Sequence, residues 1–289
     1  MKRGAPLLLS FTLLLAASGA FVTETDKWRA GYEAGLKAPQ GWLSVAGLFW
    51  LKQGENRVGS AEGSEIRLPA RCSAHAATII FDGARATLHA NSGSSITVNG
   101  KPAETAVLSS DQGHAPDVVE HCGVAITFIQ RGARFGIRLR DPETATRREF
   151  KGLHWFPADE KYRVRAAWHP YDPPKAIPVT NILGDTQDEP SPGYADFSLD
   201  GRQFRLEPVI EEPGELFFMF RDLTSADSTY GSGRFLKADM PKDGFVELDF
   251  NRAYNPPCAY IEFATCPLPP RQNRLPVRIE AGEKRYGAH

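Results

Sequence analysis

The chain has 289 residues, which is long enough for one large or two small hydrophobic cores. Its 34 basic and 35 acidic residues give a formal net charge of −1 at pH 7. The sequence has no basic block of the kind that binds nucleic acid, and the balanced charge gives no reason to expect a role at a membrane surface.

The N-terminus has the organisation of a secretory signal peptide. Residues 1–5 carry positive charge, residues 6–17 are an apolar run, and Ser18-Gly-Ala20 supplies the small residues of a cleavage site. The run is shorter than the roughly 20 apolar residues of a membrane-spanning helix, although an uncleaved N-terminal anchor is the alternative. We therefore expect a periplasmic or secreted protein that begins near Phe21 and has no membrane span after cleavage.

The chain has four cysteines: Cys72, Cys122, Cys258 and Cys266. An even number in an oxidising compartment predicts two disulfides, and four cysteines permit three pairings. Sequence position favours Cys72 with Cys122 and Cys258 with Cys266, because each pair then lies within one predicted domain. Zinc is the alternative, but no closely spaced cysteine or histidine pair accompanies these residues. We expect no metal and no cofactor, since neither a dinucleotide fingerprint nor a Walker loop is present.

The first predicted element is a helix over residues 25–38, where Trp28, Tyr32 and Leu36 recur every four residues on one face. Residues 42–51 form a compact apolar segment that suits a buried strand or a turn in the core.

After residue 54 the pattern is one of short strands and turns, which predicts an all-β protein with one short N-terminal helix. Asp82-Gly83, Asn99-Gly100 and Asp200-Gly201 are dipeptides favoured in tight hairpins. Strands are expected at residues 66–68, 77–81, 86–89, 96–99, 124–130 and 135–139, then at 162–168, 177–182, 195–199, 203–210, 215–221, 234–238, 245–250 and 277–281. Proline-rich loops are expected at residues 169–178 and 188–192.

This spacing of short strands predicts a β-sandwich followed by a second small barrel or sandwich. The predicted segments are 1–20 for the signal peptide, 21–53 for the helix and apolar connector, 54–140 for the sandwich, 141–149 for a linker and 150–289 for the second β domain.

The first domain resembles a forkhead-associated-type β-sandwich. The resemblance is carried by Gly54-Glu-Asn-Arg-Val-Gly-Ser60, Glu65-Ile-Arg-Leu-Pro69, Ser73-Ala-His75 and Val98-Asn-Gly-Lys101. Domains of this type commonly read phosphothreonine with an Arg after the glycine of the first motif. Here Ser60 follows Gly59, and the spacing from Ser to His is one residue short of the usual pattern. Since Arg or Lys normally meets a phosphate's charge, the resemblance supports the fold and argues against phosphopeptide binding.

A second resemblance covers nearly all of the chain after the signal peptide. The matching segments are Trp50–Asn56, Gly136–Asp141, Phe150–Pro157, Tyr230–Leu236 and Asp249–Leu275. They resemble the domain of unknown function family 1684, and the last segment is long and highly specific. The family name carries no known reaction, cofactor or catalytic residue, so the resemblance implies kinship and no particular chemistry.

The C-terminal segment 249–275 is the predicted binding site. It is rich in Asn and Arg among prolines that fix the backbone, and rigid loops of this kind often carry function. Aromatic faces beside amide and guanidinium donors suit a small carboxylate, a sugar or a peptide. The alternative is that the Asn side chains only bond the backbone of a long crossing loop. The candidate ligand-binding residues are Tyr230, Arg234, Arg252, Asn255, Asn273 and Arg274.

The interpretation that follows is an exported protein that binds a small ligand or a protein partner through this segment. The alternative is a cofactor-independent hydrolase in the same pocket, so enzyme activity is left open. Its candidate groups are the Cys258 thiol activated by His154, and a pair among Asp222, Asp249 and Glu262. No Gly-x-Ser-x-Gly elbow is present, and Ser232 between two glycines favours a hairpin or a bulge.

Overall fold

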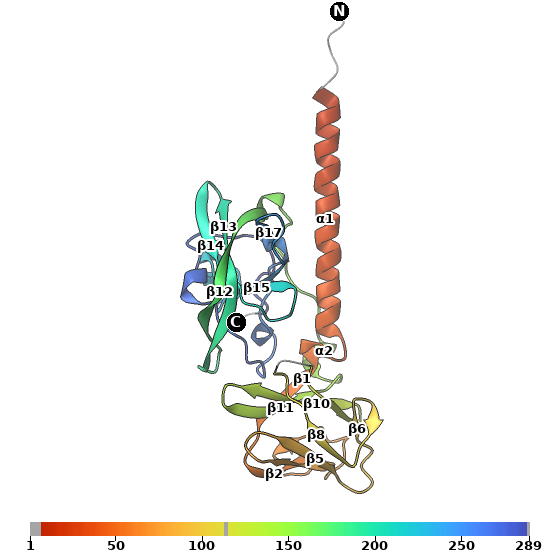
Figure 1. The fold of residues 1–289 in the computed structure, drawn as a ribbon. Coiled ribbons are helices and arrows are strands. Elements are labelled where there is room, and N and C mark those ends of the chain that lie inside the picture. The colour runs from red at the N-terminus through yellow and green to blue at the C-terminus, as the bar shows by residue number, and fades with distance from the viewer. Residues whose placement is uncertain (1–6, 113–114, 288–289) are drawn as a thin grey trace, which may run out of the picture. The chain divides into compact units, whose positions relative to one another are not determined.

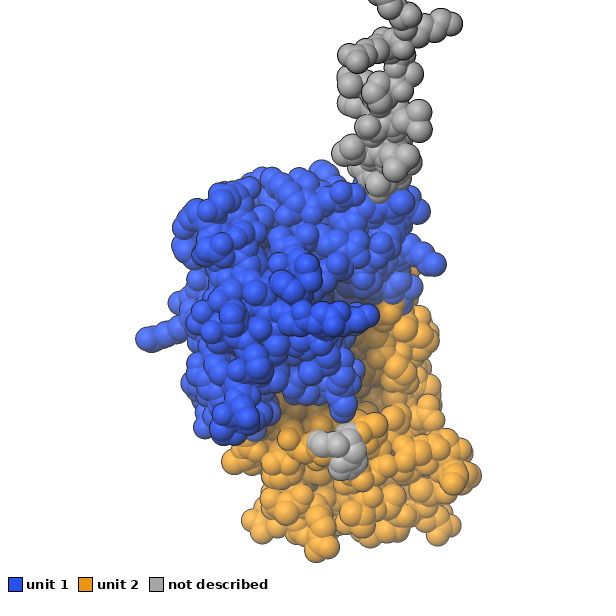
Figure 2. Space-filling view, turned by 45° about the horizontal axis from the view of Figure 1, so that its top comes forward, with its two compact units in different colours: residues 1–34, 151–259, 266–289 blue, residues 35–150, 260–265 orange. Residues whose placement is uncertain are grey.

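The computed structural model describes residues 7–112 and 115–287, so the charged start of the predicted signal peptide lies outside the described residues. The described chain is built mainly from strands, with one long helix at its beginning, which confirms the predicted all-β class (Figure 1). It divides into two compact units, which Figure 2 colours separately. Unit 1 comprises residues 1–34, 151–259 and 266–289, and unit 2 comprises residues 35–150 and 260–265.

The unit boundaries differ from the predicted segments. The expected linker, residues 141–149, belongs to unit 2 and contains a short helix, α2 (Ala145–Arg148). Asp141 ties this stretch to the rest of unit 2, because its carboxylate accepts a hydrogen bond from Arg71 at 3.0 Å. The backbone amide of Asp141 also donates to the carbonyl of Ser44 at 2.7 Å. A segment bonded in this way is part of the unit's fold.

Helix α1 (Leu7–Lys37) begins well before the predicted residue 25 and ends one residue before the predicted end. Phe21, Thr25 and Arg29 are buried at a spacing of four, which is one face of a helix. On the neighbouring face the rings of Trp28 and Tyr32 stack with centroids 5.5 Å apart. In the described part of the chain, no helix combines the length and apolar character that crossing a membrane requires.

Unit 2 contains two antiparallel-rich sheets whose inward side chains share one core, which confirms the predicted sandwich. Ile79 and Leu88 of one sheet and Ile126 and Ile137 of the other are among the buried residues of this core. The first sheet has the order β1 (Val45–Trp50), β11 (Arg134–Arg140), β10 (Val124–Arg131), β9 (Val118–His121), β6 (Thr97–Val98), β7 (Lys101–Pro102). The second has the order β3 (Ile66–Arg67), β2 (Gly54–Gly59), β4 (Ala77–Phe81), β5 (Ala86–Ala90), β8 (Thr105–Leu108).

The predicted hairpin turns join the expected strands. Asn99 and Gly100, between β6 and β7, have φ values of 52° and 74°, the pair of positive angles that a two-residue turn between twisted strands requires. Residues 42–51, predicted as a buried strand or turn, contribute β1 to this unit.

One of the two predicted disulfides is present in the structure and the other is not. Cys72 and Cys122 are bonded, with Cα atoms 5.4 Å apart, as predicted. The predicted bond between Cys258 and Cys266 is wrong for this structure, in which no disulfide joins them.

Unit 1 is built around a four-stranded antiparallel sheet and a separate β-hairpin that share a second core (Figure 1). Aromatic rings fill this core; those of Phe197 and Phe220 both pack on Phe250. The sheet has the order β14 (Arg202–Leu206), β13 (Thr186–Leu199), β12 (Arg163–Thr180), β17 (Phe245–Asp249). The hairpin pairs β15 (Glu215–Phe220) with β16 (Arg234–Asp239).

The predicted proline-rich loops at 169–178 and 188–192 are wrong, because these residues continue β12 and β13 as paired strands. β12 pairs with β17 only up to Ala167, and β13 pairs with β14 only from Ala195. The proline-rich stretches therefore lie in a two-stranded ribbon, where each strand needs donors on one side alone. A register shift between Pro170 and Lys175 takes up the densest proline cluster.

The predicted strand at 277–281 is also wrong: these residues are outside any strand, although Val277, Ile279 and Ala281 are buried at a period of two. A side chain takes the place of a neighbouring strand, because the Arg234 guanidinium donates to the carbonyls of Ile279 and Ala281. Extended backbone can thus be buried without a sheet partner when a side chain bonds its polar groups.

Arg234 is 1% exposed and forms an ion pair with the equally buried Asp222, Nη2 to Oδ2 at 2.9 Å. The same carboxylate accepts hydrogen bonds from the amides of Thr224 and Ile279, each at 3.0 Å. Burial lowers the pKa of Arg234, and the Asp222 carboxylate opposes that shift. The pair joins β16, the segment after β15 and the C-terminal stretch in the core of unit 1.

Asp222→Asn should lower the free energy of unfolding by about 3–5 kcal/mol, because it leaves a buried guanidinium without its counter-charge. Urea denaturation followed by circular dichroism measures this loss. The matched control is Asp227→Asn, which removes the partner of Arg278 in a second, exposed Arg–Asp pair. That variant should leave the melting temperature nearly unchanged, and equal losses in the two variants would contradict the structural role of the buried pair.

Candidate functional site

The structure places the six predicted ligand-binding residues in different surroundings. Arg234 lies in the core pair described above, and Asn255 and Asn273 are also fully buried. No hydrogen bond or ion pair of the described chain joins any two of the six. They therefore do not form one constellation, and each has to be considered by itself.

Asn255 fastens the C-terminal stretch to the segment after β17. Its side-chain amide donates to the carboxylate of Glu283 at 2.7 Å and to the carbonyl of Lys284 at 2.8 Å. Its backbone amide donates to the other carboxylate oxygen of Glu283 at 2.8 Å. The donors of Asn255 are thus used within unit 1. This agrees with the alternative given in the sequence analysis, in which Asn side chains stabilise the backbone of a long loop.

Asn273 acts as a substitute for a neighbouring strand. Its Oδ1 accepts from the amide of Glu207 at 2.8 Å, while its Nδ2 donates to the carbonyls of Glu207 and Met219 at 2.8 and 2.9 Å. The Asn273 side chain therefore bonds both the backbone amide and the backbone carbonyl of Glu207.

The other three candidates are more accessible. Arg252 is half-buried, and it forms ion pairs with Glu24 of α1 and with Asp249, the latter at 3.3 Å. Tyr230 is half-buried and its hydroxyl donates to the backbone carbonyl and the sulfur of Cys258 at 3.4 and 3.6 Å. Arg274 is exposed.

The structure does not bring together the groups considered for a hydrolase. His154 is exposed, and the groups that contact the Cys258 thiol are Tyr230 and Cys266. Asp222 is committed to Arg234, and Glu262 is exposed. Asp249 accepts a hydrogen bond from Asn251 and pairs with Arg252. None of these contacts joins two of the three candidate carboxylates.

A cluster that the sequence did not predict surrounds Glu207, the residue after β14. Its carboxylate is buried and accepts hydrogen bonds from the Tyr171 hydroxyl at 2.6 Å, the Lys175 ammonium at 3.0 and 3.1 Å and the Gln272 amide at 2.9 Å. Together with Asn273 on its backbone, Glu207 is held by groups from β12 and from the C-terminal segment. We call Tyr171, Lys175, Glu207 and Gln272 the Glu207 cluster.

The electrostatics of the cluster keep Glu207 ionised. Burial raises the pKa of its carboxyl, but the hydrogen bonds from Tyr171, Lys175 and Gln272 outweigh burial, and the net shift is downward. Burial and the bond to Glu207 raise the pKa of Tyr171, so its hydroxyl keeps its proton. The carboxylate is therefore a fixed negative charge surrounded by donors.

An exposed aromatic row adjoins this cluster on the outward face of the sheet. The rings of His169 and Tyr194, paired across β12 and β13, stack with centroids 4.7 Å apart, and the Arg205 guanidinium lies 3.7 Å from the centre of the Tyr194 ring. Arg205 is fixed there by two bonds to Asp196 at 2.8 and 3.0 Å. Tyr171 connects the row to the cluster, since its ring lies 5.5 Å from that of Tyr194. His169, Tyr194, Asp196 and Arg205 are called the outer row below.

The sequence missed the cluster and the outer row because residues 169–178 were assigned to a loop. A signal was present: His169 and Tyr171, like Tyr194 and Asp196, are two residues apart, which places each pair on one face of a strand. The pairing of His169 with Tyr194 is fixed by the long hairpin, which proline content concealed.

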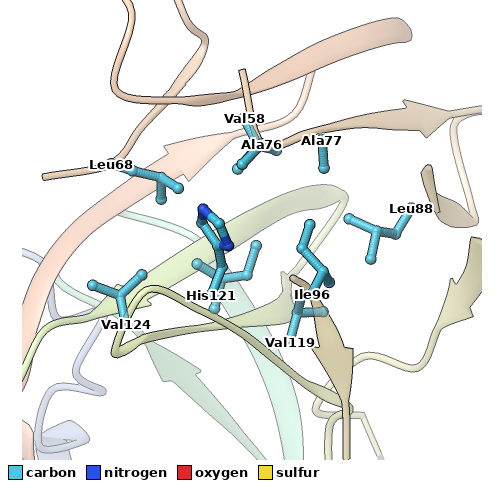
Figure 3. Close-up of a pocket in the computed structure, with 10 residues that line it drawn as sticks. Val58, Leu68, Ala76, Ala77, Leu88, Ile96, Val119, His121 and Val124 are labelled. Carbon is cyan, nitrogen blue, oxygen red and sulfur yellow. The ribbon is translucent and has the colours of Figure 1, made fainter. Parts of the chain in front are cut away.

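A small apolar cavity lies elsewhere, inside the unit 2 sandwich, and aliphatic side chains such as Val58, Leu88 and Val119 line it (Figure 3). It has room for about one water molecule. The His121 ring faces this cavity, and its nitrogens lie within hydrogen-bond distance of the Ser73 amide and the Ser95 carbonyl. The cavity is a packing defect and has no space for an organic ligand.

Glu207→Gln should lower the free energy of unfolding at pH 7 by about 1–3 kcal/mol, because it removes the charge that three donors surround. Since the folded pKa of Glu207 is depressed, this contribution is present above the carboxyl's unfolded-state pKa and is lost as pH falls through the folded value. The difference between the variant and the native chain should therefore shrink as the pH falls from 7 to below the ordinary pKa of a glutamate carboxyl. Urea denaturation at several pH values checks this, with the exposed Glu262→Gln as a control; a difference independent of pH would contradict it.

Comparisons with known proteins agree with the second resemblance found in the sequence. Residues 148–284 match the family described as "Protein of unknown function (DUF1684)". The chain is 33% identical to the uncharacterized protein from gene locus rrnAC0354 of Haloarcula marismortui, whose solution NMR structure it matches over 50% of this chain and 82% of that chain, with a TM-score of 0.41. A search of curated proteins finds no match.

Two further structures are forkhead-associated domains, each 25% identical over 32% of this chain with a TM-score of 0.23. One is the FhaA FHA domain complexed with the intracellular domain of Rv3910, matched over 97% of its length. The other, matched over 92%, comes from an analysis of phosphothreonine-dependent FHA domain interactions. The match contains three of the five predicted family segments, and residues 148–284 of this chain therefore belong to the DUF1684 family.

Proposed function

We propose that this protein is an exported binding protein and that its ligand contacts the outer row beside the Glu207 cluster. The predicted C-terminal segment contributes to this surface through Gln272, which bonds Glu207, and through Asn273, which positions it. The observation that carries the proposal is the exposed His169–Tyr194–Arg205 stack next to a buried carboxylate held by donors from separate segments.

Two observations support export. Phe21, the residue at which the mature chain is expected to start, is buried, while Gly19 and Ala20 just before it are exposed. A disulfide joins Cys72 to Cys122, and such bonds persist in oxidising compartments.

The outer row has the composition of a recognition surface. Tyrosine, histidine and arginine combine a large flat contact area with hydrogen-bonding groups, and aromatic residues and Arg are enriched at interfaces. The side chains of His169 and Arg205 are 46% and 50% exposed, so both remain accessible while their neighbours hold them in place. Side chains fixed in this way lose little conformational entropy when a ligand binds.

The ligand class that fits is a small carboxylate, a sugar or a short peptide. A flat apolar face of such a ligand would stack on the rings, and its polar groups would bond Arg205, His169 or the 49%-exposed Lys175. A depressed carboxyl pKa makes Glu207 a poor general acid or base at neutral pH, and this favours binding over hydrolysis at the Glu207 cluster.

Export predicts cleavage of the chain before Phe21. N-terminal sequencing of protein from the extracytoplasmic fraction should begin near Phe21, and Leu13→Arg with Leu14→Arg should keep the chain in the cytoplasm, because both charges interrupt the apolar run. A native chain that retains its first residues and stays in the cytoplasm would contradict export.

Binding predicts that a thermal-shift screen of carboxylates, sugars and short peptides finds a stabilising ligand. Tyr194→Ala and Arg205→Ala should each weaken its affinity about tenfold or more, which is about 1.4 kcal/mol. Arg165→Ala is the matched control, since Arg165 also covers a ring of the same sheet, that of Phe245 at 3.5 Å, and neither residue belongs to the outer row. An equal loss in Arg165→Ala, or no stabilising ligand in the three classes, would overturn the proposal.

A further inference from the structure

We propose that Cys258 and Cys266 are a redox-active dithiol that exchanges with disulfides of other molecules. The proposal is independent of the outer row and of any ligand bound there. It concerns the two cysteines that no disulfide joins in this structure, whereas Cys72 and Cys122 are bonded.

The side chains of Cys258 and Cys266 are in contact. The backbone amide of Cys258 donates to the Cys266 sulfur at 3.2 Å, and the Cys266 thiol hydrogen-bonds the Cys258 sulfur. Cys258 lies in the short 3₁₀ helix η5 (Pro257–Ala259), and prolines at 256, 257 and 267 stiffen the backbone around both cysteines. Two cysteines held in contact by a rigid backbone are placed to close into a disulfide.

The pair is asymmetric in accessibility. Cys258 is half-buried, whereas Cys266 is buried at 5% exposure. An external disulfide therefore reaches the Cys258 sulfur first, and Cys266 is protected until a neighbouring sulfur presents itself. This division into an attacking and a resolving cysteine is what exchange requires.

The surroundings of Cys258 favour its thiolate. The hydrogen bond from Cys266 lowers the pKa of the Cys258 thiol, and the bond from the Tyr230 hydroxyl adds to this effect against the opposing influence of burial. Burial and the bond to Cys258 raise the pKa of Tyr230 to about 12, so its hydroxyl remains a donor at neutral pH. Tyr230, predicted as a ligand-binding residue, is thus placed to support a thiolate nucleophile.

The reaction balances with a disulfide as the oxidant. The Cys258 thiolate attacks one sulfur of the external disulfide; the new S–S bond forms as the old one breaks, and the leaving thiolate takes the electron pair and a proton from water. The deprotonated Cys266 then attacks the Cys258 sulfur, which releases the second thiolate. The chain loses two electrons and two protons, the external disulfide gains them, and an external dithiol or two thiols reverse the sequence.

The test uses the full mature chain with its Cys72–Cys122 bond intact, in buffers of reduced and oxidised glutathione at graded ratios. Alkylation followed by mass spectrometry should show the 258–266 pair converting reversibly from dithiol to disulfide, while Cys72–Cys122 stays oxidised over the same range. A pair that stays fully reduced or fully oxidised at every ratio would overturn the proposal.

Variants separate the two roles on the same chain. Cys266→Ser should accumulate glutathione on Cys258 as a stable mixed disulfide, and Cys258→Ser should leave Cys266 unmodified because it is buried. Tyr230→Phe should slow glutathione addition to Cys258 by about threefold to tenfold at neutral pH. The difference should disappear at alkaline pH, where the Cys258 thiol is ionised in the variant and in the native chain alike. Thermal unfolding confirms that each variant is folded, and equal modification of Cys258 and Cys266 in the native chain would contradict the assigned order.

Discussion

The fold of unit 1 depends on one constraint: many of its residues after β17 are buried without belonging to a sheet. After β17 the described chain has only short 3₁₀ helices and isolated bridges, so the backbone amides and carbonyls there need other partners. Side chains supply them. Arg234 bonds two carbonyls of the terminal stretch, Asn255 bonds the carbonyl of Lys284, and Asn273 bonds both sides of residue 207. The Asn255 and Asn273 side chains that first marked this segment are thus explained by the backbone groups that they bond.

The sequence predicted those parts of the fold that local rules determine. Alternating strands and Asx-Gly turns located most of the unit 2 sandwich, and the pairing of Cys72 with Cys122 followed from their positions. It did not predict β12 and β13 in full, because proline signals a loop unless the strand's unpaired side is known. This information comes only from the tertiary structure: the positions of β17 and β14 show where a proline, which lacks a backbone amide donor, is tolerated.

The candidate site was predictable in part for the same reason. Composition identified residues 249–275 as important, and Asn273 and Gln272 do reach the Glu207 cluster. Tyr171 and Lys175 of that cluster come from a strand that was predicted as a loop, so the outer row beside them was not predicted from the sequence. Conversely, Arg234 and Asn255 have the side chains of ligand-binding residues but are used inside the core. Residue type alone does not distinguish a donor for a ligand from a donor for a buried carbonyl.

The proline-bearing ribbon of β12 and β13 has a consequence for how this protein behaves at high concentration. The edges of a two-stranded ribbon can recruit strands from other molecules and start aggregation wherever no other segment bonds them. Here the backbone of Leu268 bonds Thr180 at the end of β12. Prolines along both strands remove amide donors from those edges, and the register shift between Pro170 and Lys175 interrupts their regularity. The prolines thus protect the long ribbon from edge-to-edge association while leaving the aromatic face beside it available.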